Sequence, residues 1–298
     1  MFFSVITISY NSSKYIRDAI ESVLASSFTN FEYIIGDDCS TDDTWDMIKE
    51  YNDPRIVRYR NEINLSEYIN RNKALNLAKG EWLIFIDGDD VIHSHSLGVL
   101  FSILSKFNDI AIAVMCPENE NYIAPLTLNP KQLYEVEFSE HGLINRALSH
   151  TIYKTNILKD NPFKTDIYIG LDTLNRLEIL MKERCLIIQD NLTWWRRSPN
   201  QASKYLSYKN EMFAMSKALF LDAHCPLSIE RQQLYIKNSK IKLIRIFYKL
   251  LLKFKFFDAL KLYKVNHFNL IDLIFVFFII DCSNPLLEIN EEYRFSIK

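Results

Sequence analysis

The residues with the clearest chemical potential are carboxylates that follow two apolar segments of the chain. Asp87-Gly88-Asp89-Asp90 comes directly after an apolar run at residues 82–86, and Asp37-Asp38 comes after another at residues 33–36. Three carboxylates within four residues repel one another unless water solvates them or a cation binds them. Oxygen ligands of this kind favour Mg²⁺ or Mn²⁺ over zinc. A divalent ion held there could neutralise charge on a departing diphosphate.

A purely structural origin is also open for both clusters, because Asp is common in turns and at the starts of helices. Asp87-Gly88-Asp89-Asp90 would then be an acidic turn that caps the next helix, and Asp37-Asp38 would cap the helix that follows it. His93 and His95 lack a further partner at metal-ligand spacing, so we expect a solvated loop there and not a metal site.

The segments around these acids alternate between strand and helix patterns. Apolar runs predict strands at residues 3–9, 33–36, 56–59, 82–86, 110–115 and 185–188. Between the first two, an apolar helix face comprises Ile16, Ala19, Ile20, Val23 and Leu24. The alternation predicts an α/β fold with a mostly parallel central sheet flanked by helices. Ligands bind beyond the carboxyl ends of such strands, where both acidic clusters fall.

Polar residues and glycine indicate where helices begin and end. Residues 11–13 offer N-cap oxygens to the first helix, and Ser40 and Asp43 resemble a capping box. Gly80 is expected at a C′ position, where it would end the helix that carries Ala74 and Leu77. A further helix is expected at residues 171–183.

Composition narrows the functional classes. The chain has 298 residues and a net charge of −2, which argues against a bulk nucleic-acid binder. Five dispersed cysteines exclude a disulfide framework and suit a reducing cytosol. The six glycines form none of the phosphate-binding or nucleophile-elbow patterns, which makes dehydrogenases, Walker-type NTPases, protein kinases and serine hydrolases poor interpretations. The first residues lack the pattern of a secretory signal, which favours a cytoplasmic location.

The segment at residues 237–264 differs in composition from the rest. It carries nine Lys or Arg residues and one acid, Asp258. A basic stripe along one helix face comprises Lys242, Arg245, Lys249 and Lys253. Such a helix can lie in an anionic membrane interface, at the inner face of the cell membrane; the alternative is a packed helix pair with solvated lysines. The apolar run at residues 270–280 is too short to cross a bilayer, which takes about 20 residues.

Four ordered motifs in the N-terminal third together resemble the family 2 glycosyltransferases. They are VITISYNS at 5–12, YIIGDDCSTD at 33–42, Asn64-Leu65-Ser66 with Arg71-Asn72-Lys73-Ala74, and AKGEW at 78–82 leading to Asp87-Gly88-Asp89-Asp90. The resemblance weakens towards residue 205 and is absent beyond. It implies a GT-A catalytic domain at residues 1–205, with nucleotide-sugar binding in 1–115 and the acceptor side in 116–205. A helical region at 206–298 would follow.

The family resemblance also implies a reaction and roles for individual residues. A sugar would pass with inversion from a nucleotide sugar, UDP-sugars first, to a glycan or lipid-linked hydroxyl in surface polysaccharide or lipopolysaccharide synthesis. Ser9 and Asn11 would lie near the base and ribose, Asp38 or Asp37 would bond the base, and Arg71 would reach the nucleotide. Asp87 and Asp89 match the family's D-x-D, with Asp87 towards the ribose and Asp89 on Mn²⁺ or Mg²⁺.

By the same resemblance, Asp172 would be the general base that deprotonates the acceptor, and Arg196 or Arg197 would contact the diphosphate. An acid that stabilises a helix N-terminus is the structural alternative for Asp172. The tryptophans before Arg196 would stack on a sugar or belong to the core.

The chain departs from the family pattern at Ile8 for Pro, Cys39 for Gly or Asn, Ser66 for Gly, Leu171 for Glu and Ser198 for His. The last two keep open a non-catalytic nucleotide-sugar or glycan-binding module on the same fold. A nucleotidyltransferase shares the acidic edge but normally has a glycine- and arginine-rich N-terminal loop, whereas no glycine precedes Gly36.

Overall fold

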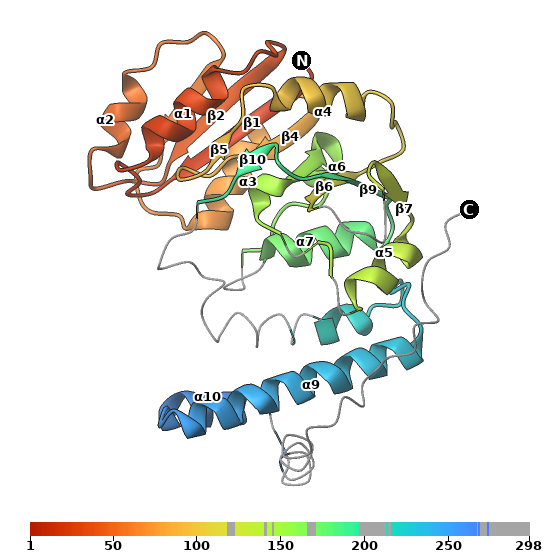
Figure 1. Cartoon of the computed structure of the whole chain (residues 1–298). Coiled ribbons are helices and arrows are strands. Elements are labelled where there is room, and N and C mark those ends of the chain that lie inside the picture. Colours follow the sequence, from red (N-terminus) through yellow and green to blue (C-terminus); the bar gives the residue numbers. More distant parts are fainter. Residues whose placement is uncertain are drawn as a thin grey trace. The chain divides into compact units, whose positions relative to one another are not determined.

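The computed structural model describes residues 1–117, 123–139, 142–144, 146–165, 171–196, 213, 216–266, 268 and 273. The chain divides into two compact units, Met1–Pro199 and Asn200–Lys298 (Figure 1). The predicted Arg197 and Ser198 lie outside the described residues, as does almost all of the apolar run at 270–280.

The first unit is built on an eight-stranded sheet in the order β3-β2-β1-β4-β8-β6-β9-β7. The strands are β1 Phe3–Ser9, β2 Phe31–Asp37, β3 Ile56–Arg60, β4 Trp82–Phe85, β6 Ile112–Cys116, β7 Leu126–Leu128, β8 Thr151–Lys154 and β9 Cys185–Gln189. β1 runs parallel to β2 and β4, whereas β8 runs antiparallel between β4 and β6. A small second sheet pairs β5 Val91–Ile92 with β10 Thr193–Trp194. The predicted mostly parallel sheet is confirmed.

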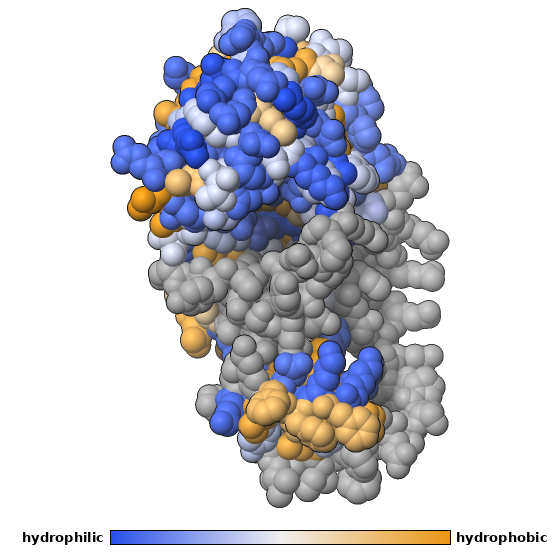
Figure 2. All heavy atoms as spheres, turned by 90° about the vertical axis from the view of Figure 1, so that its left-hand side faces the viewer, coloured by the Kyte–Doolittle hydropathy of each residue, from blue (hydrophilic) through white to orange (hydrophobic). Residues whose placement is uncertain are grey.

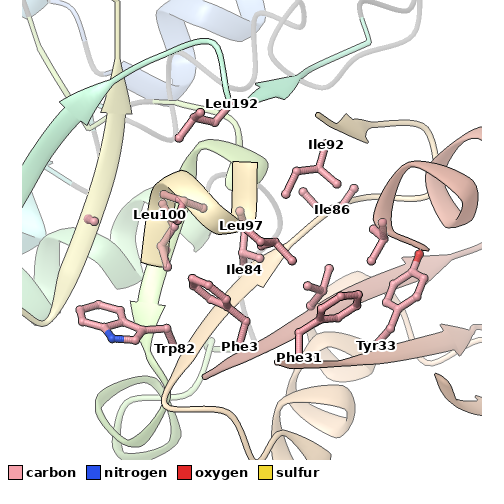
Figure 3. Packing of buried hydrophobic residues seen from close by; sticks show 14 of the residues in the cluster. Phe3, Phe31, Tyr33, Trp82, Ile84, Ile86, Ile92, Leu97, Leu100 and Leu192 are labelled. Atoms are coloured by element: carbon pink, nitrogen blue, oxygen red, sulfur yellow. The ribbon is translucent and has the colours of Figure 1, made fainter. Parts of the chain in front are cut away.

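Helices cover both faces of this sheet (Figure 1). They are α1 Ile16–Leu24, α2 Thr44–Lys49, α3 Glu67–Leu77, α4 Ser96–Leu104, α5 Pro130–Glu137, α6 Thr155–Asp160 and α7 Leu171–Leu180, with a 3₁₀ turn at Leu148–His150. The main core lies where β1, β2 and β4 pack against α1 and α4 (Figure 3). Phe3 and Tyr33 from the strands and Leu97 and Leu100 from α4 are fully buried there.

The expected helix ends are wrong in three places. α1 begins at Ile16 with no side-chain cap, so residues 11–13 do not cap it. The proposed capping box of α2 is also absent, since its N-cap Asp43 makes no cap bond. Gly80 does not end α3, because the helix stops at Leu77. A Cβ on Gly80 would come within 2.4 Å of the Phe3 backbone carbon, and this close approach of two backbones is what requires glycine.

The second unit contains two long helices, α9 Ile229–Leu252 and α10 Phe256–Asn266. The chain turns between them, with Phe254 at a φ of 57°, so a single helix across 237–264 is wrong and the alternative of a helix pair is the one observed. Leu243 and Ile244 of α9 pack with Leu262 of α10 in a separate small core. Among the described residues, no helix combines the length and the apolar character that crossing a membrane requires.

Candidate functional site

The carboxyl ends of β1, β2 and β4 bring the predicted donor-binding residues to one edge of the sheet. Ser9 pairs with Asp37 in the β1–β2 register, and the Asp38 backbone N–H donates to the Ser9 carbonyl over 2.9 Å. The loop after β4 starts beside them, because the Ile86 N–H donates to the Ile6 carbonyl over 2.9 Å. Parallel pairing of short apolar strands thus places both acidic clusters together.

The two acids of the Asp37-Asp38 pair have different surroundings. Asp37 is fully buried and accepts hydrogen bonds from the backbone and hydroxyl of Ser40, while Arg60 lies 3.3 Å from its Oδ2. Asp38 uses only Oδ1, which accepts from Asn61 Nδ2 over 2.7 Å and from the Leu65 N–H over 2.9 Å. Its Oδ2 has no hydrogen bond within the described residues. Asp37 therefore holds the loop together, and Asp38 has an acceptor oxygen to spare.

Ser9 and Asn11, both predicted near the nucleotide, also differ in whether their side chains are already used to hold the loops together. The Ser9 hydroxyl is buried and finds no hydrogen-bond partner in the part of the chain that the structure describes, which is costly for a polar group unless a ligand supplies one. A Cβ on Gly88 would lie 3.3 Å from the Ser9 Cβ, so the acidic loop runs directly over this residue. Asn11 uses its Oδ1 to accept from the Thr41 N–H over 2.8 Å. Asn11 thereby ties the loop after β1 to the loop after β2.

Asp87 is paired with a buried arginine from α3. Arg71 Nη2 lies 2.8 Å from Asp87 Oδ1 and 2.9 Å from Glu67 Oε1, and only 4% of the Arg71 side chain is exposed. Burial raises the pKa of Asp87, although the Arg71 charge opposes the rise. The ion pairs of Arg71 are therefore with protein acids, its guanidinium also stacks over the Phe85 ring, and it orients Asp87. Arg71 Nη1 is buried and has no hydrogen-bond partner among the described residues, so it remains available to a ligand.

Asp89 and Asp90 contact Arg196, which follows β10. Arg196 donates from its backbone to Asp90 Oδ1 over 3.0 Å and from Nε to the Asp89 carbonyl over 2.9 Å. Its guanidinium also reaches Asp18 on α1 over 3.0 Å and stacks over Tyr15. Arg196 thus fastens the acidic loop to α1. The Asp89 carboxylate makes no hydrogen bond or ion pair to another of the described residues.

The electrostatics of this loop suit a divalent cation. Burial raises the pKa of Asp89, and burial together with the charge of Asp87 raises the pKa of Asp90 to about 7. Carboxylates crowded in this way are stabilised by a cation. The described residues contain no group of three or more His, Cys, Asp or Glu side chains that could hold a metal alone. Asp89 and its neighbouring acids offer carboxylate oxygens, which fits Mg²⁺ or Mn²⁺, because these ions take one or two carboxylates and complete their shells with phosphates and water.

Asp172 lies in the first turn of α7 and is paired with Arg176. Arg176 Nη2 donates to Asp172 Oδ2 over 2.6 Å, and the Arg176 side chain is fully buried. Asp172 also lies close to Tyr68 of α3: burial raises the pKa of the Tyr68 phenol, and the Asp172 charge adds to the rise while Arg71 opposes it. The charges of both Asp172 and Arg71, the arginine that holds Asp87, therefore act on the pKa of Tyr68.

A hollow of about 640 Å³ lies beside Arg196. It is lined by Tyr15, His150, Asp190, Asn191, Thr193, Trp194, Trp195 and Arg196. Trp194 and Trp195 are largely exposed and do not belong to the core. Aromatic rings next to an aspartate and an asparagine are the kind of lining that binds sugars through stacking and hydrogen bonds.

The sequence reasoning missed Glu67, Tyr68 and Arg176. Two of these take part in acid–arginine pairs spaced four residues apart on one helix, Glu67 with Arg71 and Asp172 with Arg176. That spacing is visible in the sequence and places the two side chains on the same face. Tyr68 has no such signal, because its neighbour Asp172 is distant in the chain.

Solved structures with the same fold include a bacterial and an archaeal glycosyltransferase. Residues 1–349 of TarS from Staphylococcus aureus in complex with UDP-GlcNAc match with a TM-score of 0.61 at 21% identity, over 80% of this chain and 71% of that one. The mannosyltransferase PcManGT from Pyrobaculum calidifontis, in complex with GDP-Man and Mn²⁺, matches with a TM-score of 0.60 at 15% identity, over 93% and 84%. These matches confirm the GT-A fold.

Sequence relatives point the same way. TarS, a poly(ribitol-phosphate) β-N-acetylglucosaminyltransferase of S. aureus, is 29% identical over 231 residues, which cover 70% of this chain and 38% of TarS. WfaP of Escherichia coli, a UDP-Glc:α-D-GlcNAc-diphosphoundecaprenol β-1,3-glucosyltransferase, is 42% identical over 87 residues, covering 29% of this chain and 35% of WfaP. The chain thus spans well under half the length of these relatives. The model of the family described as "Glycosyl transferase family 2" matches residues 4–165. The expected enzyme class is confirmed, and the chain belongs to glycosyl transferase family 2.

Proposed function

We propose that the protein is an inverting, metal-dependent glycosyltransferase that moves a sugar from a UDP-sugar to a hydroxyl of a glycan or lipid-linked glycan in cell-surface polysaccharide synthesis. The observation that carries the proposal is the convergence of unsatisfied polar groups on one sheet edge. Within the described residues, the Ser9 hydroxyl and Arg71 Nη1 are buried without hydrogen-bond partners, next to acids whose pKa values burial raises. A bound nucleotide sugar with its metal would satisfy these groups.

Donor binding is assigned to the ends of β1 and β2. Asp38, with its spare Oδ2, would accept a hydrogen bond from the base, and Ser9 would meet the ribose or the base. Asp37 and Asn11 would shape the loops and make no direct contact, which narrows the set expected from sequence. Support for UDP comes from TarS, whose structure holds UDP-GlcNAc.

The metal is assigned to Asp89, and Asp87 would face the ribose while Arg71 fixes its orientation. A bound Mg²⁺ or Mn²⁺ would neutralise charge on the departing diphosphate. The archaeal fold relative was solved with Mn²⁺, which supports this assignment. Arg196 would act by holding the acidic loop against α1. Arg197 is proposed, as before, to contact the diphosphate.

The acceptor would be activated by Asp172. Its carboxylate would take the proton of the acceptor hydroxyl as that oxygen forms a bond to the anomeric carbon and the bond to the diphosphate breaks. Attack opposite the leaving group inverts configuration. Arg176 would hold the Asp172 carboxylate in a fixed direction, and Trp194 and Trp195 would stack on acceptor sugar rings. WfaP acts on a diphosphoundecaprenol-linked sugar, which supports a lipid-linked acceptor reached at the inner face of an anionic membrane.

Calorimetric titration of UDP-sugars with and without Mn²⁺ tests the donor and metal assignments, and UDP release tests turnover. One UDP-sugar should bind wild type more tightly with Mn²⁺, and Asp89→Ala should abolish this metal effect. Asp172→Asn should bind the donor normally and lose turnover. Asp46→Asn, on the exposed face of α2, serves as the matched control. Binding without turnover in wild type, even with lipid acceptors, would favour the alternative of a non-catalytic binding module.

A further inference from the structure

Five apolar side chains stand exposed at the turn between α9 and α10. This corner patch consists of Leu252 (80% exposed), Phe254 (81%), Phe256 (58%), Phe257 (91%) and Leu260 (50%). Figure 2 shows apolar side chains gathered at this end of the second unit, with hydrophilic ones beside them. Large apolar groups scattered singly on a surface are ordinary, but five within nine positions form a patch that usually has a partner.

The corner patch is distinct from the apolar face of α9 that carries Ile244 and Tyr248. Most of that face is covered within the second unit: Ile244 is buried against α10, and the Tyr248 hydroxyl donates to the Leu273 carbonyl over 2.8 Å. The free apolar surface lies at the turn because Phe254 takes a left-handed backbone conformation, with a φ of 57°. That turn ends α9 and starts α10 before their side chains can cover the corner.

Positive charge surrounds the corner patch. Lys249, Lys253, Lys255 and Lys264 are exposed, and Asp258 is the one acid within α10 and the turn. Lysines next to exposed aromatic rings can extend along the apolar surface and place their ammonium groups at lipid phosphates. An identical patch in a symmetric dimer would instead bring these lysines against one another, which like-charge repulsion disfavours.

We infer that the corner patch inserts into the interface of an anionic lipid bilayer and holds the enzyme at the membrane. Phenylalanine and leucine would enter the boundary between headgroups and acyl chains, while the lysines bind anionic headgroups. The inference rests on the proposed function in one respect, since a lipid-linked acceptor requires the enzyme to work at a membrane surface. The contact would use the corner and the lysines around it, and leave Lys242 and Arg245 of the basic stripe in solvent.

Flotation of the full chain tests this with vesicles of phosphatidylcholine alone and of phosphatidylcholine and phosphatidylglycerol in equal parts. The chain should float with the mixed vesicles and lose binding as salt rises. Phe256→Ser with Phe257→Ser should weaken binding at least about tenfold, because two apolar rings leave the interface. Lys253→Gln with Lys255→Gln should weaken binding to mixed vesicles about thirtyfold and leave binding to neutral vesicles unchanged.

Ile229→Ser is the matched control, since Ile229 is also exposed but sits at the other end of α9, roughly 35 Å along the helix. It should float like wild type. Failure of wild type to bind mixed vesicles would overturn the inference. So would a phenylalanine double variant that floats normally but changes oligomeric state in sedimentation, because a second copy would then cover the patch. Titration of UDP-sugar without vesicles tests the proposed function separately, because the patch lies outside Met1–Pro199.

Discussion

Ser66 is the position where replacing a side chain should stabilise the protein most clearly. It precedes α3 with a φ of 70° and a ψ of 163°, a region that only glycine adopts without strain. Its side chain makes no cap bond to the helix. The strain costs about 1–3 kcal/mol, and glycine loses about 0.5–1 kcal/mol more entropy on folding. Ser66→Gly should therefore raise the free energy of unfolding by about 0.5–2 kcal/mol.

Urea and thermal unfolding followed by circular dichroism measure this change. For a unit of this size, about 1 kcal/mol raises Tm by about 2–4 °C. Ser66→Ala is the control, because alanine keeps the strain and removes only the hydroxyl, so its stability should equal that of wild type. If Ser66→Gly is less stable than wild type, or if alanine stabilises as much as glycine, backbone strain is not the reason for the effect.

Three further predictions concern Asp37, Asp42 and Gly80. Asp37→Asn should lower the free energy of unfolding by about 2 kcal/mol, because the Asp37 carboxylate is buried and charge-paired. Asp38→Asn should chiefly weaken UDP binding. Urea unfolding measures the first effect and calorimetry the second. Partial burial tends to raise the pKa of Asp42, but hydrogen bonds to its carboxylate lower this pKa to about 2. The ionised carboxylate therefore stabilises the fold by about 1–2 kcal/mol above pH 4, and this stabilisation is lost as pH falls towards 2. The difference in stability between wild type and Asp42→Asn should therefore close in acid. Gly80→Ala should destabilise the protein by about 3 kcal/mol or more, because the added Cβ would overlap the backbone of β1. Gly98→Ala, with open space around it in α4, should instead stabilise the protein by up to about 1 kcal/mol. Equal effects of the two substitutions in thermal melts would refute this distinction.

The sequence was sufficient for the six strands with long apolar runs and for the edge at which the acids meet. Apolar runs such as Phe3–Ser9 carry their own signal, and parallel pairing then fixes where Asp37 and Asp87 must lie. β8 was not predicted, because its four residues gain their strand conformation from pairing with β4 and β6, both distant in the chain. The hydrogen-bond partner of Asn11 was missed for the same reason, because it lies on the loop after β2, which is distant in the chain.

Two buried arginines explain why family acids are held in place here even though neighbouring positions depart from the family pattern. Arg71 and Arg176 are almost wholly inaccessible, and a guanidinium in such a place must be paired because its charge cannot be removed. Each arginine is paired with an acid four residues earlier on its own helix, and Arg71 also reaches Asp87. Since breaking a buried pair leaves an uncompensated charge, the fold itself holds Asp87 and Asp172 in position. Leu171, which replaces the family's Glu, is buried and leaves the Asp172–Arg176 pair intact, so this departure alone does not remove the proposed base.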